Sequence, residues 1–269
     1  MPLKLFAGLS YLICVVVCLP SHLVLLWIFI SSREFRQNMS YVIMINLGIF
    51  ECLETALFLY DGVASLTGGS LGDLVETVIG GLNASAWEAH IIVILILALQ
   101  RLNTFLPYFK PKLFGILLFL NWISFIARFL IHFFTNCCYF DSEKFIWQFR
   151  LGHTLDTYHG IAYYVNIVAL VAAFLCYVLI VGFMCFQRNK VSNIEIRLLV
   201  QSVIIFLYTA AQITLYDIAG KVFPESPYTL IALGIVHILN GGVNPLLYVT
   251  MNKKVRDKLR EQLSGDQAT

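Results

Sequence analysis

Three acidic side chains, Glu51, Glu54 and Asp61, lie within one long apolar run of this chain, residues 41–66. At about 100° per residue, the three carboxylates fall within an arc of about 80° on a helix. Acids inside a membrane helix are costly and generally face the interior of a helix bundle. The spacing therefore predicts a buried polar network at Glu51, with a neutral, merely hydrogen-bonded glutamic acid as the alternative. Asp61 lies near the end of the run, where solvation is the simpler interpretation.

A second chemical feature closes the last apolar run, where Asn244 and Pro245 precede Lys253, Lys254 and Arg256. Proline removes a backbone donor and clashes with the preceding turn, so the helix kinks and a carbonyl loses its partner. In lipid, such a defect persists only where neighbouring helices, polar side chains or water satisfy the freed group. The pair predicts a kinked, hydrated last helix at the cytoplasmic end of a helix-bundle switch.

Patterns that would indicate catalysis or metal binding are weak. His153, Asp156 and His159 are spaced i, i+3 and i+6, which brings zinc-ligand side chains roughly to one side of a helix, but without a fourth ligand no metal site is predicted. Arg128 and His132 lie one turn apart and either meet an acid, in the protein or in a ligand, or more simply snorkel to the outer interface. The six histidines are scattered along the chain, which disfavours a membrane hydrolase. The sequence predicts no enzyme, no cofactor and no nucleic-acid partner.

The composition places the chain in a membrane. It is 59% hydrophobic and 13% charged, whereas a soluble domain carries about 25% charged residues. Seven apolar runs are long enough to cross a bilayer, which takes about 20 helical residues, and no strand pattern of period two recurs. The predicted fold is therefore an all-α membrane protein, a seven-helix transmembrane domain over residues 1–251. The predicted spans are 5–30, 41–66, 74–106, 113–134, 158–186, 196–219 and 228–251.

The positive charges predict the orientation. With the N-terminus outside, the inner segments hold 13 Lys and Arg residues and the outer segments hold four, Lys4, Lys144, Arg150 and Lys221. This bias places the C-terminus in the cytoplasm. Residues 252–269 form the predicted tail, in which Val255, Leu259 and Leu263 recur every four residues between lysines and arginines. The pattern predicts a short amphipathic helix on the inner leaflet, although ordinary juxtamembrane charge explains the composition equally well.

Several motifs together resemble the rhodopsin-like G-protein-coupled receptors. The second run holds Asn46-Leu47-Gly48-Ile49-Phe50-Glu51, similar to the family's Asn-Leu-Ala-x-x-Asp. The third run ends in Gln100-Arg101-Leu102, where the family has Asp/Glu-Arg-Tyr, and the last run holds Asn240-Gly241-Gly242-Val243-Asn244-Pro245-Leu246-Leu247-Tyr248. Within that superfamily, the stretch from Gln100 to Pro107 and the ending Asn-Gly-Gly-Val-Asn-Pro look like nematode serpentine chemoreceptors, of class X or a sister class.

The chain also departs from the receptor pattern. No cysteine opens the third run, so the family's usual disulfide to the second outer loop is missing, while Cys137 and Cys138 are adjacent in that loop. A vicinal bond, an intermolecular bond or free thiols are the alternatives for this pair. The fifth and sixth runs lack the family's prolines. These departures fit a divergent chemoreceptor.

The resemblance implies a role for residues at both ends of the bundle. Arg101 would contact the G protein in the active state and pair with Glu195 in the resting state, and Tyr177 would approach Tyr248 when the helices rearrange. Glu51 would pair with Asn240 and Asn244. An outward-opening pocket between helices would bind the ligand. Its candidate residues are Asn83, Trp87, Tyr163, Tyr216, Asp217 and His237.

The sequence therefore predicts a chemosensory G-protein-coupled receptor. It would transmit binding of a small extracellular ligand to a cytoplasmic heterotrimeric G protein from the plasma membrane, and a sensory cilium would suit that role. The rival is a seven-helix ion channel or transporter, which would need a continuous polar path. The acids of the second run together with Arg128 are the only hint of such a path.

Overall fold

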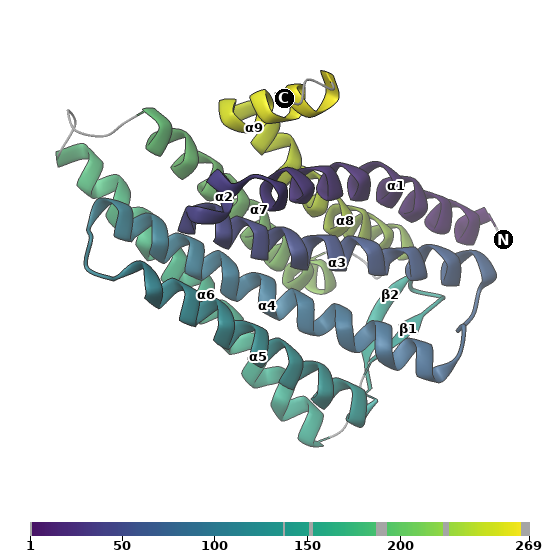
Figure 1. Ribbon diagram of the computed structural model, residues 1–269. Helices are drawn as coiled ribbons and strands as arrows, with labels where there is room; N and C mark the ends of the chain where they lie inside the picture. Colours follow the sequence, from purple (N-terminus) through teal and green to yellow (C-terminus); the bar gives the residue numbers. More distant parts are fainter. Residues whose placement is uncertain (1, 137, 151–152, 187–192, 223–225, 265–269) are drawn as a thin grey trace.

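The computed structural model describes residues 2–136, 138–150, 153–186, 193–222 and 226–264, with the side chains of 153–155, 193–194, 217–222 and 263–264 left aside. Seven of its helices are long and apolar enough to cross a membrane, which confirms the predicted seven-helix bundle (Figure 1). They are α1 (Pro2–Ser31), α3 (Met39–Thr67), α4 (Asp73–Phe105), α5 (Pro111–Thr135), α6 (His153–Phe186), α7 (Asn193–Val222) and α8 (Pro227–Met251). The short helices are α2 (Arg33–Gln37) and the tail helix α9 (Lys253–Ser264).

Helix α4 is the central element, because it packs against α3, α5, α6 and α7. Helix α1 packs against α3 and α8, so these three form a second group beside it (Figure 1). Large apolar side chains such as Trp27, Phe119 and Val168 remain exposed on α1, α5 and α6. In a protein that spans a bilayer, these side chains form the surface that contacts lipid.

Small residues let α1, α3 and α8 approach closely. A Cβ atom on Gly8 of α1 would lie 2.7 Å from the carbonyl oxygen of Gly62 on α3, and a Cβ on Gly241 of α8 would overlap Oγ1 of Thr55. Close backbone approach through small residues is typical of membrane helix interfaces. These contacts bring the polar faces of the three helices together.

Replacing Gly241 with alanine is expected to destabilise the bundle by about 1–3 kcal/mol, because the added methyl overpacks the contact with Thr55. The measurement is thermal unfolding of the detergent-solubilised protein. Gly182→Ala is the matched control, since nothing lies within 4 Å of a Cβ added there on α6. An unchanged melting temperature in Gly241→Ala would contradict the close approach of α3 and α8.

An antiparallel hairpin, which the sequence did not predict, follows α5. It consists of β1 (Cys138–Asp141) and β2 (Ile146–Phe149), with Cys138 opposite Phe149. The hydroxyl of Tyr11 on α1 donates a hydrogen bond to the carbonyl of Phe145 at 3.0 Å, which fastens the turn to the bundle. The hairpin lies at the end where α1 begins, called the hairpin end below (Figure 1). The opposite end, which holds α2 and α9, is called the tail end.

Candidate functional site

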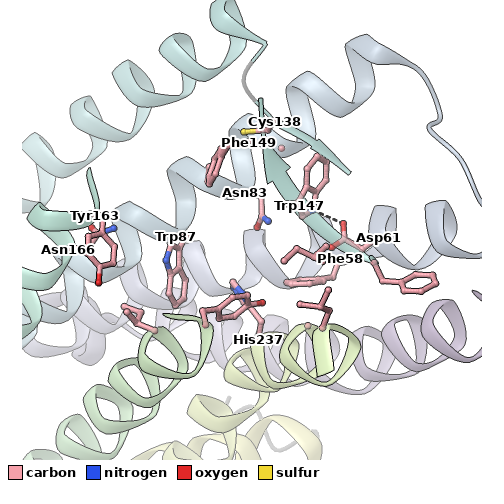
Figure 2. Close-up of a pocket in the computed structure, with 18 of the residues that line it drawn as sticks. Phe58, Asp61, Asn83, Trp87, Cys138, Trp147, Phe149, Tyr163, Asn166 and His237 are labelled. Atoms are coloured by element: carbon pink, nitrogen blue, oxygen red, sulfur yellow. Dashed lines mark hydrogen bonds between the residues drawn. The ribbon is translucent and has the colours of Figure 1, made fainter. Parts of the chain in front are cut away.

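The three acids of α3 are all buried: Glu51, Glu54 and Asp61 are exposed by only 1%, 3% and 2%. For Asp61 this corrects the expectation of a solvated side chain. The hairpin covers it, and Trp147 Nε1 donates a hydrogen bond to Asp61 Oδ1 at 2.9 Å (Figure 2). The error arose because the position of Asp61 near the helix end was judged without the hairpin.

Three histidines from three helices surround the two glutamates. Nε2 of His22 on α1 lies 3.5 Å from Glu51 Oε2, and Nε2 of His90 on α4 lies 3.9 Å from Glu51 Oε1. The other ring nitrogen of His90, Nδ1, lies 3.4 Å from Glu54 Oε1, and Nε2 of His237 on α8 lies 3.5 Å from Glu54 Oε2. We name this series His22–Glu51–His90–Glu54–His237 the acid–imidazole chain.

The acid–imidazole chain corrects the interpretation that the histidines are scattered, since three of the six converge on one site. Its nitrogen–oxygen separations of 3.4–3.9 Å exceed the 2.7–3.2 Å of a hydrogen bond. Among the residues that the structure describes, no group of three ligands is arranged to hold a metal ion. His153, the first residue of the weak zinc pattern, has its side chain outside the described part.

Helix α8 joins the acid–imidazole chain through Asn244. The Asn244 side-chain amide donates a hydrogen bond to Glu51, and Pro245 follows inside the helix. Asn240 is also buried, but its amide nitrogen has no hydrogen-bond partner among the described residues, so its place in the network remains a prediction. Glu51 is thereby connected to Asn244, which directly precedes Pro245, a residue of α8 without a backbone N–H donor.

Arg101 is buried at the tail end, with 3% of its surface exposed. Its guanidinium donates to the hydroxyls of Ser202 on α7 at 3.1 Å and Ser40 on α3 at 3.2 Å. The Tyr177 hydroxyl donates to the carbonyl of Ser202 at 3.3 Å, which brings α6 to the same point. The pairing of Arg101 with Glu195, in the first turn of α7, remains a prediction.

The tail helix is held against the same end. Val255 of α9 is fully buried, and the side-chain amide of Asn252 donates to the hydroxyl of Tyr41 at 3.0 Å. Lys254 donates a hydrogen bond to Glu34 of α2, and this carboxylate raises the pKa of the lysine. Tyr248, at the end of α8, packs its ring edge-on against Phe29. The tail end thus ties α9 to α1, α2 and α8.

A cavity of about 310 Å³ opens at the hairpin end (Figure 2). Five of the six candidate ligand residues line it: Asn83, Trp87, Tyr163, Tyr216 and His237. The side chain of the sixth, Asp217, lies outside the described residues. Figure 2 places Asp61 and Trp147 toward one side and Tyr163 and Asn166 toward the other. The cavity volume is at the lower end of the range of about 300–1,000 Å³ that is usual for small-molecule sites.

The cavity and the acid–imidazole chain share His237. The ring of Trp87, another cavity residue, lies 4.8 Å from the ring of His237 and 5.6 Å from that of His90. A molecule in the cavity would therefore lie against His237, which belongs to the acid–imidazole chain, and against Trp87, which packs on two of its rings. Sequence reasoning missed His22 and His90, because the acids that they approach lie on a different helix, α3.

Arg128 does not snorkel toward an interface. Its Nη1 lies 3.2 Å from Oε2 of Glu88 on α4, and Nε2 of the buried His132 lies 4.0 Å from the other oxygen of Glu88. This corrects the simpler interpretation given above, and the partner was missed because Glu88 lies in a different helix. The pair joins α4 to α5 and is separate from the cavity wall.

Comparison with known proteins agrees with this architecture. Residues 3–268 match the family model described as Serpentine type 7TM GPCR chemoreceptor Srt. The match covers nearly the whole chain, including the cavity, the acid–imidazole chain and the tail end. No curated protein matches the chain.

Proposed function

We propose that this chain, which belongs to the Srt family of serpentine type 7TM GPCR chemoreceptors, transmits the binding of a small extracellular ligand to a heterotrimeric G protein. The ligand binds in the cavity at the hairpin end, and the G protein binds at the tail end. The receptor itself carries out no chemistry on the ligand and promotes nucleotide exchange on its partner. Its place is the plasma membrane, and a sensory cilium suits a chemosensory role.

The observation that carries this proposal is a series of contacts that leads from the cavity toward the tail end. His237 lines the cavity and contacts Glu54, and His90 joins Glu54 to Glu51. Glu51 in turn accepts a hydrogen bond from Asn244, beside the Pro245 interruption of α8. A ligand that moves His237 therefore alters a series of contacts that crosses α3 and α4 and returns to α8 at Asn244, beside Pro245.

Signalling requires that the ligand bind one bundle state more tightly than the other. The contacts of the acid–imidazole chain are long, so a shift of a few tenths of an ångström at His237 changes how well each carboxylate is compensated. At the tail end, Arg101 on α4 donates to Ser40 on α3 and to Ser202 on α7, and the bond to Ser202 is the one that would break when the cytoplasmic ends of α6 and α7 move. These two sets of contacts are where the resting and the active arrangement of the bundle would differ.

The proposed orientation puts the hairpin end outside. Helix α9 contacts α1 near Ser31, so the N-terminus and the tail helix lie at opposite ends of the bundle. The excess of Lys and Arg in the inner segments supports a cytoplasmic tail end. The G protein would then meet Arg101, the loop between α6 and α7, and α9.

A ligand screen with a G-protein readout tests this function. Arg101→Ala is expected to reduce agonist-driven nucleotide exchange about tenfold or more, because the mutant lacks the guanidinium that would contact the G protein in the active state. A hydrogen bond to a charged group is worth about 1.5–3 kcal/mol, and 1.4 kcal/mol corresponds to a factor of ten. The measurement is nucleotide exchange on purified G protein, with surface expression recorded in parallel.

Arg36→Ala is the matched control, because it removes an exposed arginine from the same end of the bundle. An undiminished agonist response in Arg101→Ala would count against the role of Arg101. A ligand-evoked ionic current in the absence of G protein would instead favour the rival channel.

A further inference from the structure

Asp61 is the one carboxylate among the described residues that line the cavity. It is almost completely buried, so the charge of an ionised Asp61 would be poorly screened by water. The indole N–H of Trp147 occupies one of its oxygens, and a carboxylate offers about four acceptor positions in all. Asp61 therefore keeps acceptor capacity for another donor.

No lysine or arginine belongs to the described cavity wall. The basic side chain in the described wall is His237, which faces Glu54. Arg128 is engaged with Glu88 outside the wall. Within the described wall, therefore, no lysine or arginine neutralises Asp61, and a cationic bound molecule would supply that charge.

Aromatic rings make up much of the remaining surface: Phe58, Trp87, Trp147, Phe149, Tyr163 and Tyr216. Aromatic faces attract ammonium groups, most strongly where water is excluded, and the same faces accommodate an apolar body. A carboxylate ligand would meet Asp61 at one side and Glu54 behind His237, so like charges would oppose its entry. A neutral apolar ligand would gain nothing from Asp61.

We infer that the cavity binds a small organic cation, a primary amine or a quaternary ammonium with one apolar or aromatic group, and that Asp61 holds its cationic head. This inference rests on the proposed role of the cavity as the ligand site. A primary ammonium head would donate to Asp61 beside the Trp147 indole, whereas a quaternary head, which has no N–H, would pair with Asp61 by charge and with the aromatic faces. In both cases the apolar group would lie toward Trp87 and Tyr163.

The test compares three molecules of similar shape on the purified receptor in lipid nanodiscs at pH 7: 2-phenylethylamine, 2-phenylethanol and phenylacetate. The trimethylammonium derivative of the amine is included as a second cation. Binding is measured by isothermal titration calorimetry and by saturation-transfer NMR. We expect the two cations to bind at least about tenfold more tightly than the alcohol. The amine would make a charge-assisted hydrogen bond, which is roughly twice as strong as a neutral one, and the trimethylammonium derivative would gain from charge and from the aromatic faces.

Asp61→Asn keeps the shape of the side chain and removes its charge. It is expected to weaken amine binding about 100-fold, since truncating one partner of a buried charge pair has effects of that size, and to change binding of the alcohol less than about threefold. Asp73→Asn is the matched control, because it removes an exposed acid from the same end of the bundle, outside the cavity wall. The comparison of the three molecules on the unmodified receptor decides the question even if Asp61→Asn does not fold.

Equal or tighter binding of the alcohol or the acid, or no saturable binding of either cation, would overturn the inference. Nucleotide exchange on the G protein is recorded with the same molecules. If the alcohol binds at least as tightly as the cations and drives exchange, the inference of a cationic ligand is wrong and the proposed receptor function stands. If the amines bind in a way that depends on Asp61 but cause no exchange on any G protein, the inference of a cationic ligand stands and the proposed receptor function is wrong.

Discussion

Replacing His90 with leucine is expected to destabilise the bundle by about 3–5 kcal/mol and to remove the response to ligand. His90 is fully buried, and its two ring nitrogens lie 3.4 Å from Glu54 and 3.9 Å from Glu51. Without the ring, two buried acids face each other across an apolar gap. The measurements are thermal unfolding in detergent and agonist-driven nucleotide exchange.

The triple variant Glu51→Gln, Glu54→Gln and His90→Leu is the control for this effect. If the imidazole acts by compensating the two acids, removing the acids should restore about 0.5–3 kcal/mol of the loss, as coupled residues do. Nucleotide exchange should stay low, because the connection from His237 to Asn244 is still broken. A triple variant as unstable as the sum of its parts would show that His90 contributes by packing alone.

Glu88→Leu is expected to destabilise the protein by about 3–5 kcal/mol, because it leaves the Arg128 guanidinium uncompensated between α4 and α5. Arg128→Leu should cost less, about 1–3 kcal/mol, because an isolated glutamate can take up a proton whereas arginine stays charged. His132, 4.0 Å from Glu88, further eases the loss of the arginine. Chemical unfolding of each variant in detergent measures the difference.

The double variant Glu88→Leu, Arg128→Leu separates charge from packing. Its stability should lie above that of Glu88→Leu, since no unpaired charge remains and leucine suits the apolar surroundings. Equal destabilisation by the two single substitutions would contradict the argument, because it would mean that the charge of Arg128 is satisfied by something other than Glu88.

The seven helices could be predicted from the sequence because each is a long apolar run, and the length of a run is a local property. The same holds for the tail helix, whose apolar residues recur every four positions around Val255. The acidic face of α3 could also be predicted from the sequence, since Glu51 and Glu54 are three residues apart on one helix. Local periodicity determines which side chains share a face.

The partners of that face could not be predicted in the same way. His22, His90 and His237 lie on α1, α4 and α8, and only the packing of four helices brings their rings to two carboxylates. The hairpin was missed because each strand has only four residues, too few to give a period-two pattern. Without the hairpin, neither the burial of Asp61 nor the contribution of Trp147 to the cavity was foreseeable.

The tryptophans of this chain fall into two pairs. Trp87 and Trp147 line the cavity, whereas Trp27 lies on the exposed face of α1 and Trp122 packs between Phe50 and Phe125 away from it. Because indole emission responds to nearby charge and polarity, two of the four tryptophans report on cavity occupancy and the other two serve as an internal reference. The receptor therefore carries its own optical sensor, and occupancy can be followed without attaching a dye.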